Sequence, residues 1–365
     1  MSAIFDHPSY DDHEVVHAIT NRRSGLRGFI AVHSTRLGPA LGGTRLWCYP
    51  HPAAALEDVL RLSRGMTAKA ALAGLPLGGG KAVLLAHPGL DHAAALTAYA
   101  RHVELLGGRF ITGEDVGITV ADADLLHQTT RYVAGTSAAE GGLGDPSPRT
   151  AAGVMAAMCA ALAALDRDPT LENRRVAVSG LGKVGSALCE QLAEAGAALV
   201  VADVSPAAVR RTAARVRGSL EVTDPASVHT TDCDVFAPCA LGSVLHPTAI
   251  AELRCRAVVG SANNQLAGSG CAELLAERGV LYVPDYLANA GGLIQVAGEW
   301  LGWDRHVIEE RTAAIQHTAA AVLGAAACRG LTPAAAADAL VAQRLASAPA
   351  SAGDEVHGRR ATADG

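Results

Sequence analysis

The stretch between residues 175 and 203 limits the possible folds most strongly. A short apolar strand is predicted at Arg175–Ser179, and it leads directly into the glycine-rich segment Gly180–Gly185, GLGKVG. A helical pattern covers Lys183–Ala195, and a second apolar strand at Ala198–Ala202 ends at Asp203. Strands that alternate with helices in this way are typical of parallel sheets with helices on both faces. The stretch therefore predicts a doubly wound α/β domain.

The same alternation continues downstream. The further elements predicted are a helix at Pro206–Val216, short strands at Asp234–Ala237, Ala257–Gly260 and Leu281–Val283, a nearly uninterrupted helical region at Asn289–Cys328 and a last helix at Thr332–Ala348.

The glycine-rich segment has the spacing G-x-G-x-x-G in the context that binds dinucleotides. The first glycine permits a tight turn, the second lets the backbone approach a pyrophosphate, and the third lets the helix pack on the strand. A carboxylate at the end of the next strand can bind ribose hydroxyls and repel a 2′-phosphate, which favours NAD over NADP. Arg210 and Arg211, on the following helix, leave that preference open. The residues predicted here to bind NAD are Gly180, Gly182, Lys183, Val184, Gly185 and Asp203.

The N-terminal half has no such repeat and is predicted to be an α+β domain. Its strands are predicted at Val15–Ala18, Gly28–Val32, Leu37–Trp47 (interrupted by Gly42 and Gly43), Ala82–Leu85 and Arg109–Asp115, and its helices at Ala53–Gly65, Leu90–Leu106 and Ala121–Thr130. The segment Gly135–Pro148 is rich in Gly, Ser and Pro, which makes it the candidate interdomain hinge. We therefore expect a first domain at residues 1–138, a dinucleotide-binding domain at 139–330, a C-terminal helix at 331–348 that packs back on the first domain, and a disordered tail at 349–365.

Composition excludes several classes of protein. The chain has 365 residues, of which 50% are apolar and 18% charged, and this suits a soluble globular enzyme. A net charge of -6 argues against nucleic-acid binding. No apolar run reaches the length of a membrane span, and the N-terminus lacks the features of a signal peptide. The eight cysteines form no C-x-x-C pair and no Cys/His cluster, so we expect buried thiols, no metal site and a cytoplasmic protein.

The segment Gly65–Lys81, GMTAKAALAGLPLGGGK, holds two lysines, Lys69 and Lys81, the second after three glycines. Spacing alone does not decide between two surface lysines on a helix-loop-strand turn and two cations in an apolar cleft. In a cleft, one lysine can hold a carboxylate, and the other can act as a base if burial and a nearby cation lower its pKa. Glu114 and Asp115, in the segment GEDVG, offer carboxylates for proton transfer.

At this point the chain resembles a known family, the amino-acid dehydrogenases that include the glutamate, leucine, valine and phenylalanine enzymes. The motifs that carry the resemblance lie in order between residues 36 and 300: GPALGGTR, GMTAK, LPLGGGK, TGEDVG, GLGKVG, FAPCALG, SANNQL and PDYLANAGG. The resemblance implies a two-domain enzyme with its active site in the cleft between the domains. It also implies reversible, NAD(P)-dependent oxidative deamination of an L-amino acid to a 2-oxo acid and ammonia, and symmetric self-assembly through the N-terminal domain.

The resemblance also implies roles for individual residues. Lys69 would bind the substrate α-carboxylate, Lys81 would activate the water that attacks the imine, and Asp115 would exchange protons, with Glu114 structural. Asn263 would contact the nicotinamide side. The remaining residues implied on the substrate side are Leu41, Gly42, Gly43, Gly113, Asn289, Leu293 and Val296.

Substrate choice follows from the same resemblance. Glutamate-specific members carry a further lysine nine positions before the first motif lysine, and this chain has Leu60 there, so the pocket is expected to be apolar. Leucine members tend to pair Ala with Val at the positions of Gly113 and Leu293, whereas phenylalanine members tend to pair Gly with Leu. This favours phenylalanine, with leucine and valine close behind, unless the two residues are compensating core substitutions.

Two other functions stay open at this point. One is a non-catalytic NAD-binding regulator on the same fold, and the joint presence of Lys69, Lys81 and Asp115 argues against it. The other is a biosynthetic enzyme that diverts the imine or oxo acid into a condensation, which the sequence does not exclude.

Overall fold

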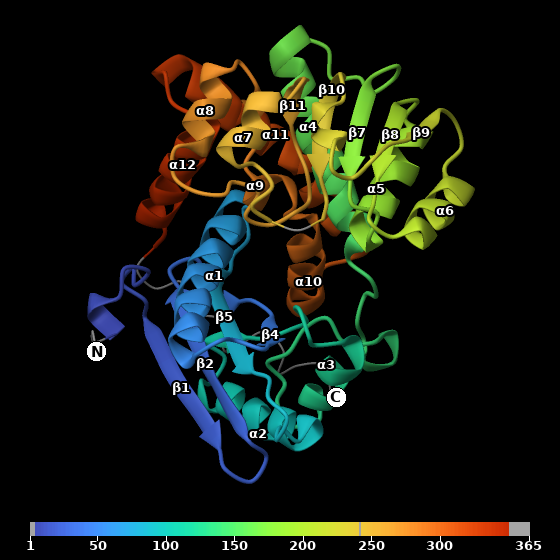
Figure 1. Cartoon of the computed structure of the whole chain (residues 1–365). Coiled ribbons are helices and arrows are strands. Elements are labelled where there is room, and N and C mark those ends of the chain that lie inside the picture. The colour runs from blue at the N-terminus through green and yellow to red at the C-terminus, as the bar shows by residue number, and fades with distance from the viewer. Residues whose placement is uncertain (1–3, 241, 350–365) are drawn as a thin grey trace. The chain divides into compact units, whose positions relative to one another are not determined.

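A computed structural model describes residues 4–240 and 242–349 (Figure 1). The described chain forms two compact units. The first unit runs to Gly144 and takes in Val296–Trp303 and the chain from Val341 onward, and the second comprises Asp145–Gln295 and Asp304–Leu340. The expected division already placed the last helix on the first domain, but it did not include the return of Val296–Trp303 to that unit. The predicted disordered tail lies, from residue 350 on, outside the described residues.

The first unit is built on a mixed six-stranded sheet in the order β1-β2-β5-β3-β6, with β4 paired to β5. The strand pairs β1–β2 and β2–β5 are antiparallel, while β3 runs parallel to both β5 and β6 and β4 runs parallel to β5. The strands are β1 (Val15–Asn21), β2 (Leu26–Ser34), β3 (Ala40–Leu41), β4 (Thr44–Trp47), β5 (Gly78–Leu85) and β6 (Phe110–Ile111). The helices are α1 (Pro52–Leu72), α2 (His92–Leu105) and α3 (Val120–His127), with short 3-10 turns η1 (Ile4–Asp6) and η2 (Ala138–Glu140).

Helices α1 and α2 cover opposite faces of this sheet (Figure 1). Successive residues of a strand point to opposite faces. Accordingly Ala31 and Val83 pack with residues of α1, whereas Ile30 and Ala82 pack in a second cluster with residues of α2. The fully buried Tyr99 of α2 lies in that second cluster.

The predicted loop around the three glycines is wrong. Helix α1 continues through GMTAK to Leu72, and Gly78–Gly80 begin strand β5 rather than a loop. A Cβ atom on Gly79 would lie 2.0 Å from the backbone nitrogen of Thr67 in α1. Glycine is therefore present because a helix backbone crosses closely over the strand.

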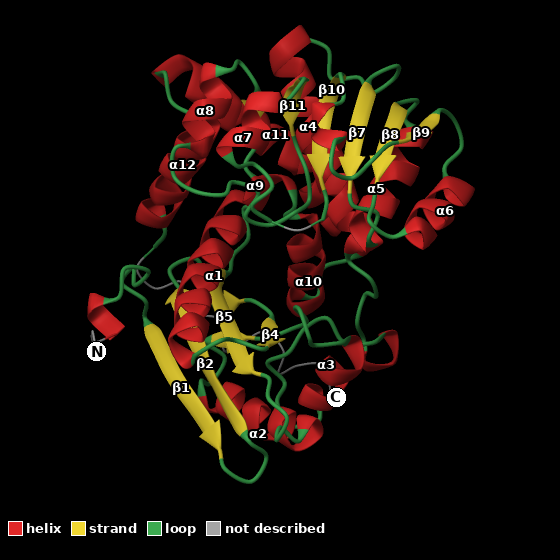
Figure 2. Ribbon diagram, viewed as in Figure 1, coloured by secondary structure: helices red, strands yellow, loops and turns green. Residues whose placement is uncertain are grey.

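The second unit is built on a fully parallel six-stranded sheet in the order β12-β11-β10-β7-β8-β9, which Figure 2 shows in yellow. This confirms the predicted doubly wound domain. Its strands are β7 (Arg175–Ser179), β8 (Ala198–Ala202), β9 (Leu220–Val222), β10 (Cys233–Pro238), β11 (Cys255–Val258) and β12 (Leu281–Tyr282). Its helices are α4 (Ser147–Asp166), α5 (Lys183–Glu194), α6 (Pro206–Arg215), α7 (Pro247–Glu252), α8 (Cys271–Glu277), α9 (Asp285–Ala288) and the 3-10 turn η3 (Val228–Thr230).

Strand β9 was not predicted. It has only three residues, Leu220–Val222, and two of them are exposed. An exposed edge strand of this length shows neither an apolar run nor an alternation that a sequence pattern could detect.

The long C-terminal helical region is interrupted, contrary to prediction. Helix α10 (Gly291–Leu301) ends before Gly302, whose φ is +67°, and Asp304 caps the next helix, α11 (Arg305–Arg329), by accepting from the nitrogen of Val307 at 2.9 Å. The last part of α10 belongs to the first unit, where Glu299 accepts from the nitrogen of Gly135 at 2.7 Å.

The last helix, α12 (Pro333–Ser347), corresponds to the predicted helix at Thr332–Ala348 and is one residue shorter at each end. Its C-terminal part belongs to the first unit, where Arg344 donates to the carbonyl oxygen of Leu72 at 3.0 Å.

Two expectations need correction, one about the cysteines and one about the length of apolar segments. Cys48 and Cys328 are exposed, so the cysteines are not all buried thiols. Helix α4 is long and apolar enough, by length and composition, to cross a membrane. Within the second unit it packs closely on α11, because a Cβ atom on Gly153 would lie 2.8 Å from the side chain of Ile315. We therefore interpret α4 as a core helix.

Candidate active site

Glycines bring four segments of the first unit together. A Cβ atom on Gly42 would lie 1.9 Å from the carbonyl oxygen of Gly80 and 3.3 Å from the side chain of Met66. A Cβ atom on Gly43 would lie 2.1 Å from the carbonyl oxygen of Glu114. Only a residue without a side chain allows backbones to approach this closely. The connection between β3 and β4, helix α1, strand β5 and the loop after β6 therefore meet at one place, and these are the four motif segments predicted to carry the chemistry.

Lys81 and Asp115, the two predicted reacting residues, form an ion pair there. The Lys81 Nζ lies 3.2 Å from the Asp115 Oδ2, and Lys81 is only 6% exposed. Burial lowers the pKa of Lys81, the Asp115 carboxylate opposes that effect, and the Arg45 cation adds to it. A lysine whose pKa is lowered in this way is able to act as a base closer to neutral pH.

The carboxyl group of Asp115 is kept ionised by its two cationic neighbours. Burial alone would raise the pKa of Asp115, but Lys81 and Arg45 together hold it below its usual value. The guanidinium Nε of Arg45 lies 2.9 Å from the same carboxylate oxygen that Lys81 contacts. The pair is thus a carboxylate shared between two cations.

Sequence reasoning missed Arg45 and the residues that hold it. Arg45 is the last residue of the GPALGGTR motif, but the motif alone assigns it no contact. In the structure its Nη1 lies 3.0 Å from the Oδ2 of Asp58 on α1, and the hydroxyl of Tyr49 donates to that same oxygen. Neither Asp58 nor Tyr49 stands in a motif, so only the fold reveals this group.

The other residues predicted to contact the substrate differ in burial and in local packing. Lys69 lies on α1 and is half-buried, and Leu41, in β3, is only 2% exposed. Gly113 precedes the Glu114–Asp115 pair, and a Cβ atom on it would lie 2.8 Å from the carbonyl oxygen of Ala134. The absence of a side chain at position 113 therefore has a local packing reason, besides any room it leaves for substrate.

Leu60 lies in the hydrophobic core. It is 0% exposed and packs with Ala31, Ala55, Val59 and Val83 between α1 and the sheet. A lysine there would have to leave this core to meet a ligand, so position 60 does not line a substrate pocket, and the sequence argument for an apolar pocket from this position is wrong.

The glycine-rich segment of the second unit forms a tight turn at the start of α5. Gly180 has a φ of +101°, and a Cβ atom on Gly185 would lie 2.0 Å from the Gly180 carbonyl oxygen. Gly182 has no atom within 4 Å of its Cβ position, and it begins α5 without a side-chain cap. Lys183 and Val184 form the first turn of α5. The open backbone at a helix N-terminus leaves its N–H groups available to phosphate oxygens.

Asp203 stands at the end of β8, as predicted, and its carboxylate contacts the glycine turn. Its Oδ2 accepts from the nitrogen of Leu181 at 2.6 Å, and its Oδ1 accepts from the nitrogen of Ser205 at 2.7 Å. The carboxylate is half-buried beside the turn.

Asn263 and Asn289 are hydrogen-bonded to each other in the second unit. The Nδ2 of Asn289 donates to the Oδ1 of Asn263 at 2.8 Å and to the carbonyl oxygen of Ser261 at 3.1 Å. The Oδ1 of Asn289 is buried and has no hydrogen-bond partner among the described residues. Leu293 and Val296 follow one turn apart on α10, and both are half-buried.

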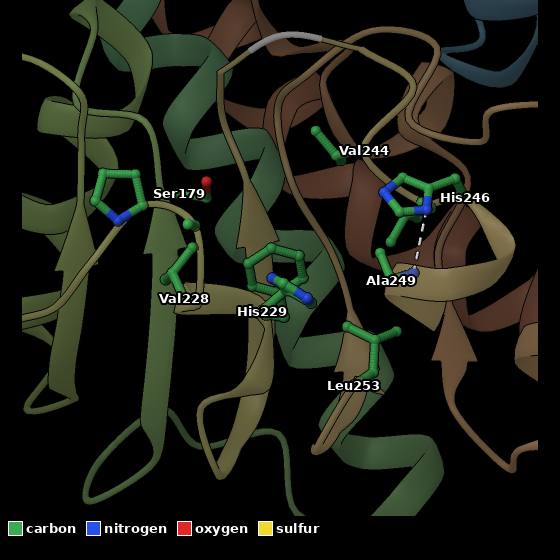
Figure 3. Close-up of a pocket in the computed structure, with 11 residues that line it drawn as sticks. Ser179, Val228, His229, Val244, His246, Ala249 and Leu253 are labelled. Atoms are coloured by element: carbon green, nitrogen blue, oxygen red, sulfur yellow. Dashed lines mark hydrogen bonds between the residues drawn. The ribbon is translucent and has the colours of Figure 1, made fainter. Parts of the chain in front are cut away.

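A cavity of about 210 Å³ lies within the second unit, beside the end of β7 (Figure 3). Ser179, the residue before Gly180, lines it together with Phe236 of β10. The dashed line in Figure 3 marks the bond in which His246 accepts from the nitrogen of Ala249 at the start of α7. The rest of the lining is largely apolar: Pro225, Ala226, Val228, Val244, Leu245 and Leu253, with His229.

Comparison with known proteins identifies the family. The family model described as Glu/Leu/Phe/Val dehydrogenase, dimerisation domain, matches residues 13–135. The model described as Glutamate/Leucine/Phenylalanine/Valine dehydrogenase matches residues 141–210 and 205–353.

Individual relatives agree over nearly the whole chain. Leucine dehydrogenase from Thermoactinomyces intermedius is 43% identical over 343 residues, which cover 94% of this chain and 93% of that protein. Valine dehydrogenase from Streptomyces albus is 45% identical over 346 residues, covering 94% and 95%. The crystal structure of L-tryptophan dehydrogenase from Nostoc punctiforme is 40% identical, with a TM-score of 0.81, and covers 92% of this chain and 96% of its own. The predicted resemblance is confirmed: the chain belongs to the glutamate, leucine, phenylalanine and valine dehydrogenase family and is an NAD(P)-dependent amino-acid dehydrogenase.

Proposed function

We propose that this enzyme catalyses the reversible, NAD-dependent oxidative deamination of an apolar L-amino acid to its 2-oxo acid and ammonia. The observation that carries the proposal is the buried Lys81–Asp115 pair, with its Nζ–Oδ2 distance of 3.2 Å and its lowered lysine pKa. A lysine whose pKa is lowered by burial, beside an ionised carboxylate, is suited to moving protons between water and an amine.

The residues of the first unit divide the chemistry between them. Lys69 holds the α-carboxylate as a point charge. Lys81, when neutral, takes a proton from the water that adds to the imine carbon. Asp115 takes the proton that the substrate ammonium loses as the imine forms and returns it to the amine nitrogen of the adduct. Ammonia then leaves as the carbonyl forms. The balance is one amino acid, one NAD⁺ and one water giving one oxo acid, one ammonia, one NADH and one proton.

When bound, NAD supplies the acceptor for the hydride that leaves the substrate Cα. The backbone of Gly180, Gly182 and Gly185 and the N-terminus of α5 bind the pyrophosphate, and Asp203 binds the adenosine ribose. The open Cβ position of Gly182 and the uncapped start of α5 support this assignment. The cavity beside Ser179, which has both polar and apolar lining groups, lies next to this turn.

NAD is preferred to NADP in this proposal because Asp203 presents a carboxylate where a 2′-phosphate would lie. Arg210 and Arg211, on α6, are exposed. They are the cations that would have to reach such a phosphate.

The substrate is an apolar amino acid, and a branched aliphatic side chain is favoured over phenylalanine. Leucine and valine dehydrogenases are among the relatives at 43–45% identity. The sequence argument for phenylalanine rested on Gly113 together with Leu293. The missing side chain at position 113 is already accounted for by the carbonyl oxygen of Ala134, 2.8 Å from its Cβ position. Phenylalanine and tryptophan stay as alternatives. Glutamate is disfavoured because an apolar pocket would leave its side-chain carboxylate unpaired.

The experiment is a panel of leucine, valine, phenylalanine, tryptophan and glutamate with NAD⁺, in which NADH, ammonia and oxo acid are all quantified. The proposal expects the three products in equal amounts, the highest kcat/KM with leucine or valine, and little turnover of glutamate. Oxo acid or ammonia in smaller amounts than NADH would support a biosynthetic enzyme that diverts the oxo acid. NADH binding without turnover of any amino acid would support a regulator. We further propose that the protein works in the cytoplasm as a homo-oligomer, because its first unit matches a dimerisation domain.

A further inference from the structure

Asp115 presents its two carboxylate oxygens unequally. Both cations contact Oδ2: the Arg45 Nε at 2.9 Å and the Lys81 Nζ at 3.2 Å. No hydrogen bond from a described residue reaches Oδ1. A carboxylate held by one oxygen can offer the other to a reacting group without losing its orientation.

Arg45 is itself held from its far side. Its Nη1 contacts the Oδ2 of Asp58 at 3.0 Å, and the hydroxyl of Tyr49 donates to the same oxygen. The side chains of Arg45 and Asp58 are 23% and 28% exposed, so this chain of contacts is largely removed from water. The guanidinium therefore bridges two carboxylates from a fixed position, which its planar, forked shape suits better than a lysine would.

We propose that Arg45 is the positioning residue for proton transfer in this enzyme, that Asp58 and Tyr49 anchor it, and that it fixes Asp115 by Oδ2 so that Oδ1 faces the reacting amine. The proposal rests on the deaminase function proposed above, and it adds three residues that the motif-based assignment does not include.

The charges around the pair agree with this role. The groups that act on Lys81 are Asp115, Arg45 and Asp58, and among them only Arg45 lowers its pKa. Arg45 also lowers the pKa of Asp115, together with Lys81. Removal of the Arg45 charge should therefore raise both pKa values, whereas loss of packing alone should reduce activity without moving them.

The test compares Arg45→Gln, Arg45→Lys and Asp58→Asn with Arg61→Gln as a matched control. Arg61 is an exposed arginine on the same unit, 3.9 Å from Glu57, and its replacement should leave activity unchanged. For Arg45→Gln we expect kcat with the preferred amino acid to fall roughly 10- to 100-fold, because misplacement of a reacting group by about 1 Å costs that much. NADH binding should be unchanged, since it belongs to the second unit.

The pH dependence separates positioning from a structural role. In Arg45→Gln the profile of kcat against pH should move to higher pH by about one unit, the lower end of the effect expected when a neighbouring cation is lost. Arg45→Lys should restore part of kcat and most of the profile. Asp58→Asn should lower kcat without moving the profile upward, because the Arg45 charge remains.

Three results would overturn the proposal. The first is an Arg45→Gln enzyme whose kcat stays within twofold of the wild type, and the second is one that loses activity equally at every pH. If Arg45→Gln does not fold, unchanged kcat in both Arg45→Lys and Asp58→Asn is the third.

A measurement independent of turnover tests the role of Arg45 separately from the proposed deaminase function. The pKa of Asp115, followed by carbon NMR of its labelled carboxyl group, should rise by about one unit in Arg45→Gln, and an unchanged value would refute the role of Arg45 even in an enzyme that turns over no amino acid. A wild-type enzyme that is inactive with every amino acid, but in which this rise occurs, would reject the deaminase function alone.

Discussion

Replacement of Asp115 by asparagine tests the proposed site through both stability and rate. Asparagine has nearly the same shape, but it leaves the Lys81 ammonium, with a side chain only 7% exposed, and the Arg45 guanidinium without the carboxylate they share. Removing one partner of a buried ion pair costs about 3–5 kcal/mol. Lys81 can limit the cost by losing its proton. From a reference pKa of about 10.4, that loss costs about 4.6 kcal/mol at pH 7 and about 0.5 kcal/mol at pH 10, at about 1.36 kcal/mol per pH unit.

The pH dependence of the loss in stability follows from this deprotonation of Lys81. In Asp115→Asn the folded-state pKa of Lys81 lies below its unfolded value, so between the two values the unfolded chain binds more protons than the folded one. Stability of the variant therefore rises with pH through that window. We expect the deficit in the free energy of unfolding, relative to the wild type, to be about 3–5 kcal/mol at pH 7 and clearly smaller at pH 10.

The assays are urea unfolding at the two pH values and steady-state kcat with the preferred amino acid. Loss of the proton-transfer carboxylate should lower kcat by about 10²- to 10⁴-fold. Glu57→Gln, at an exposed position on α1, is the control and should change neither quantity. A stability deficit that does not narrow with pH, or a kcat within about tenfold of the wild type, would refute the reasoning.

Three further predictions concern specificity. Leu60→Lys should not create glutamate activity, and thermal unfolding should show a loss of stability of several kcal/mol, because it places an unpaired ammonium in the core; glutamate turnover by a stable variant would contradict the placement of Leu60. The replacement Leu293→Val should raise the ratio of kcat/KM for leucine to that for phenylalanine, and an unchanged ratio would reject Leu293 as a size determinant. Asp203→Ser should weaken NAD⁺ binding by more than it weakens NADP⁺ binding, as measured by fluorescence titration. Some loss of affinity is expected with both cofactors, because the replacement also releases the nitrogen of Leu181. Equal losses would reject the proposed basis for the cofactor preference.

The second unit could be predicted from sequence because its signals are local. Strand β7 and strand β8 have the predicted bounds, and α5 begins at Lys183 as expected. The glycine spacing, the apolar strands and the carboxylate at the strand end all lie within one short stretch of chain. Strand β9 was missed because a three-residue exposed strand at the sheet edge has almost no pattern.

The first unit was harder because its glycines serve tertiary contacts. The three glycines before Lys81 have the pattern of a loop, yet they form a strand because the backbone of α1 passes 2.0 Å from the Cβ position of Gly79. Similarly, the contacts of Gly113 with Ala134 have no signal in the sequence around either residue. Tertiary packing overrode the local pattern in both places.

The sequence predicted the two candidate reacting residues, but it did not predict the residues that hold them in place. Lys81 and Asp115 stand in motifs, and the structure places them 3.2 Å apart. Arg45, Tyr49 and Asp58 lie close together in the sequence, on β4, the loop after it and α1, but no spacing rule pairs them. Their association follows only from the register of β4 against β5 and from the position of α1.

The central claim is that Lys81 is a reacting group rather than a structural cation. Its most direct test is single-turnover formation of NADH by Lys81→Ala with the preferred amino acid, alongside NADH affinity measured by fluorescence. The account predicts that turnover is lost, that NADH affinity equals that of the wild type, and that added methylamine restores part of the rate by occupying the space of the missing amine. A Lys81→Ala enzyme that forms NADH at a near-normal rate would contradict the claim.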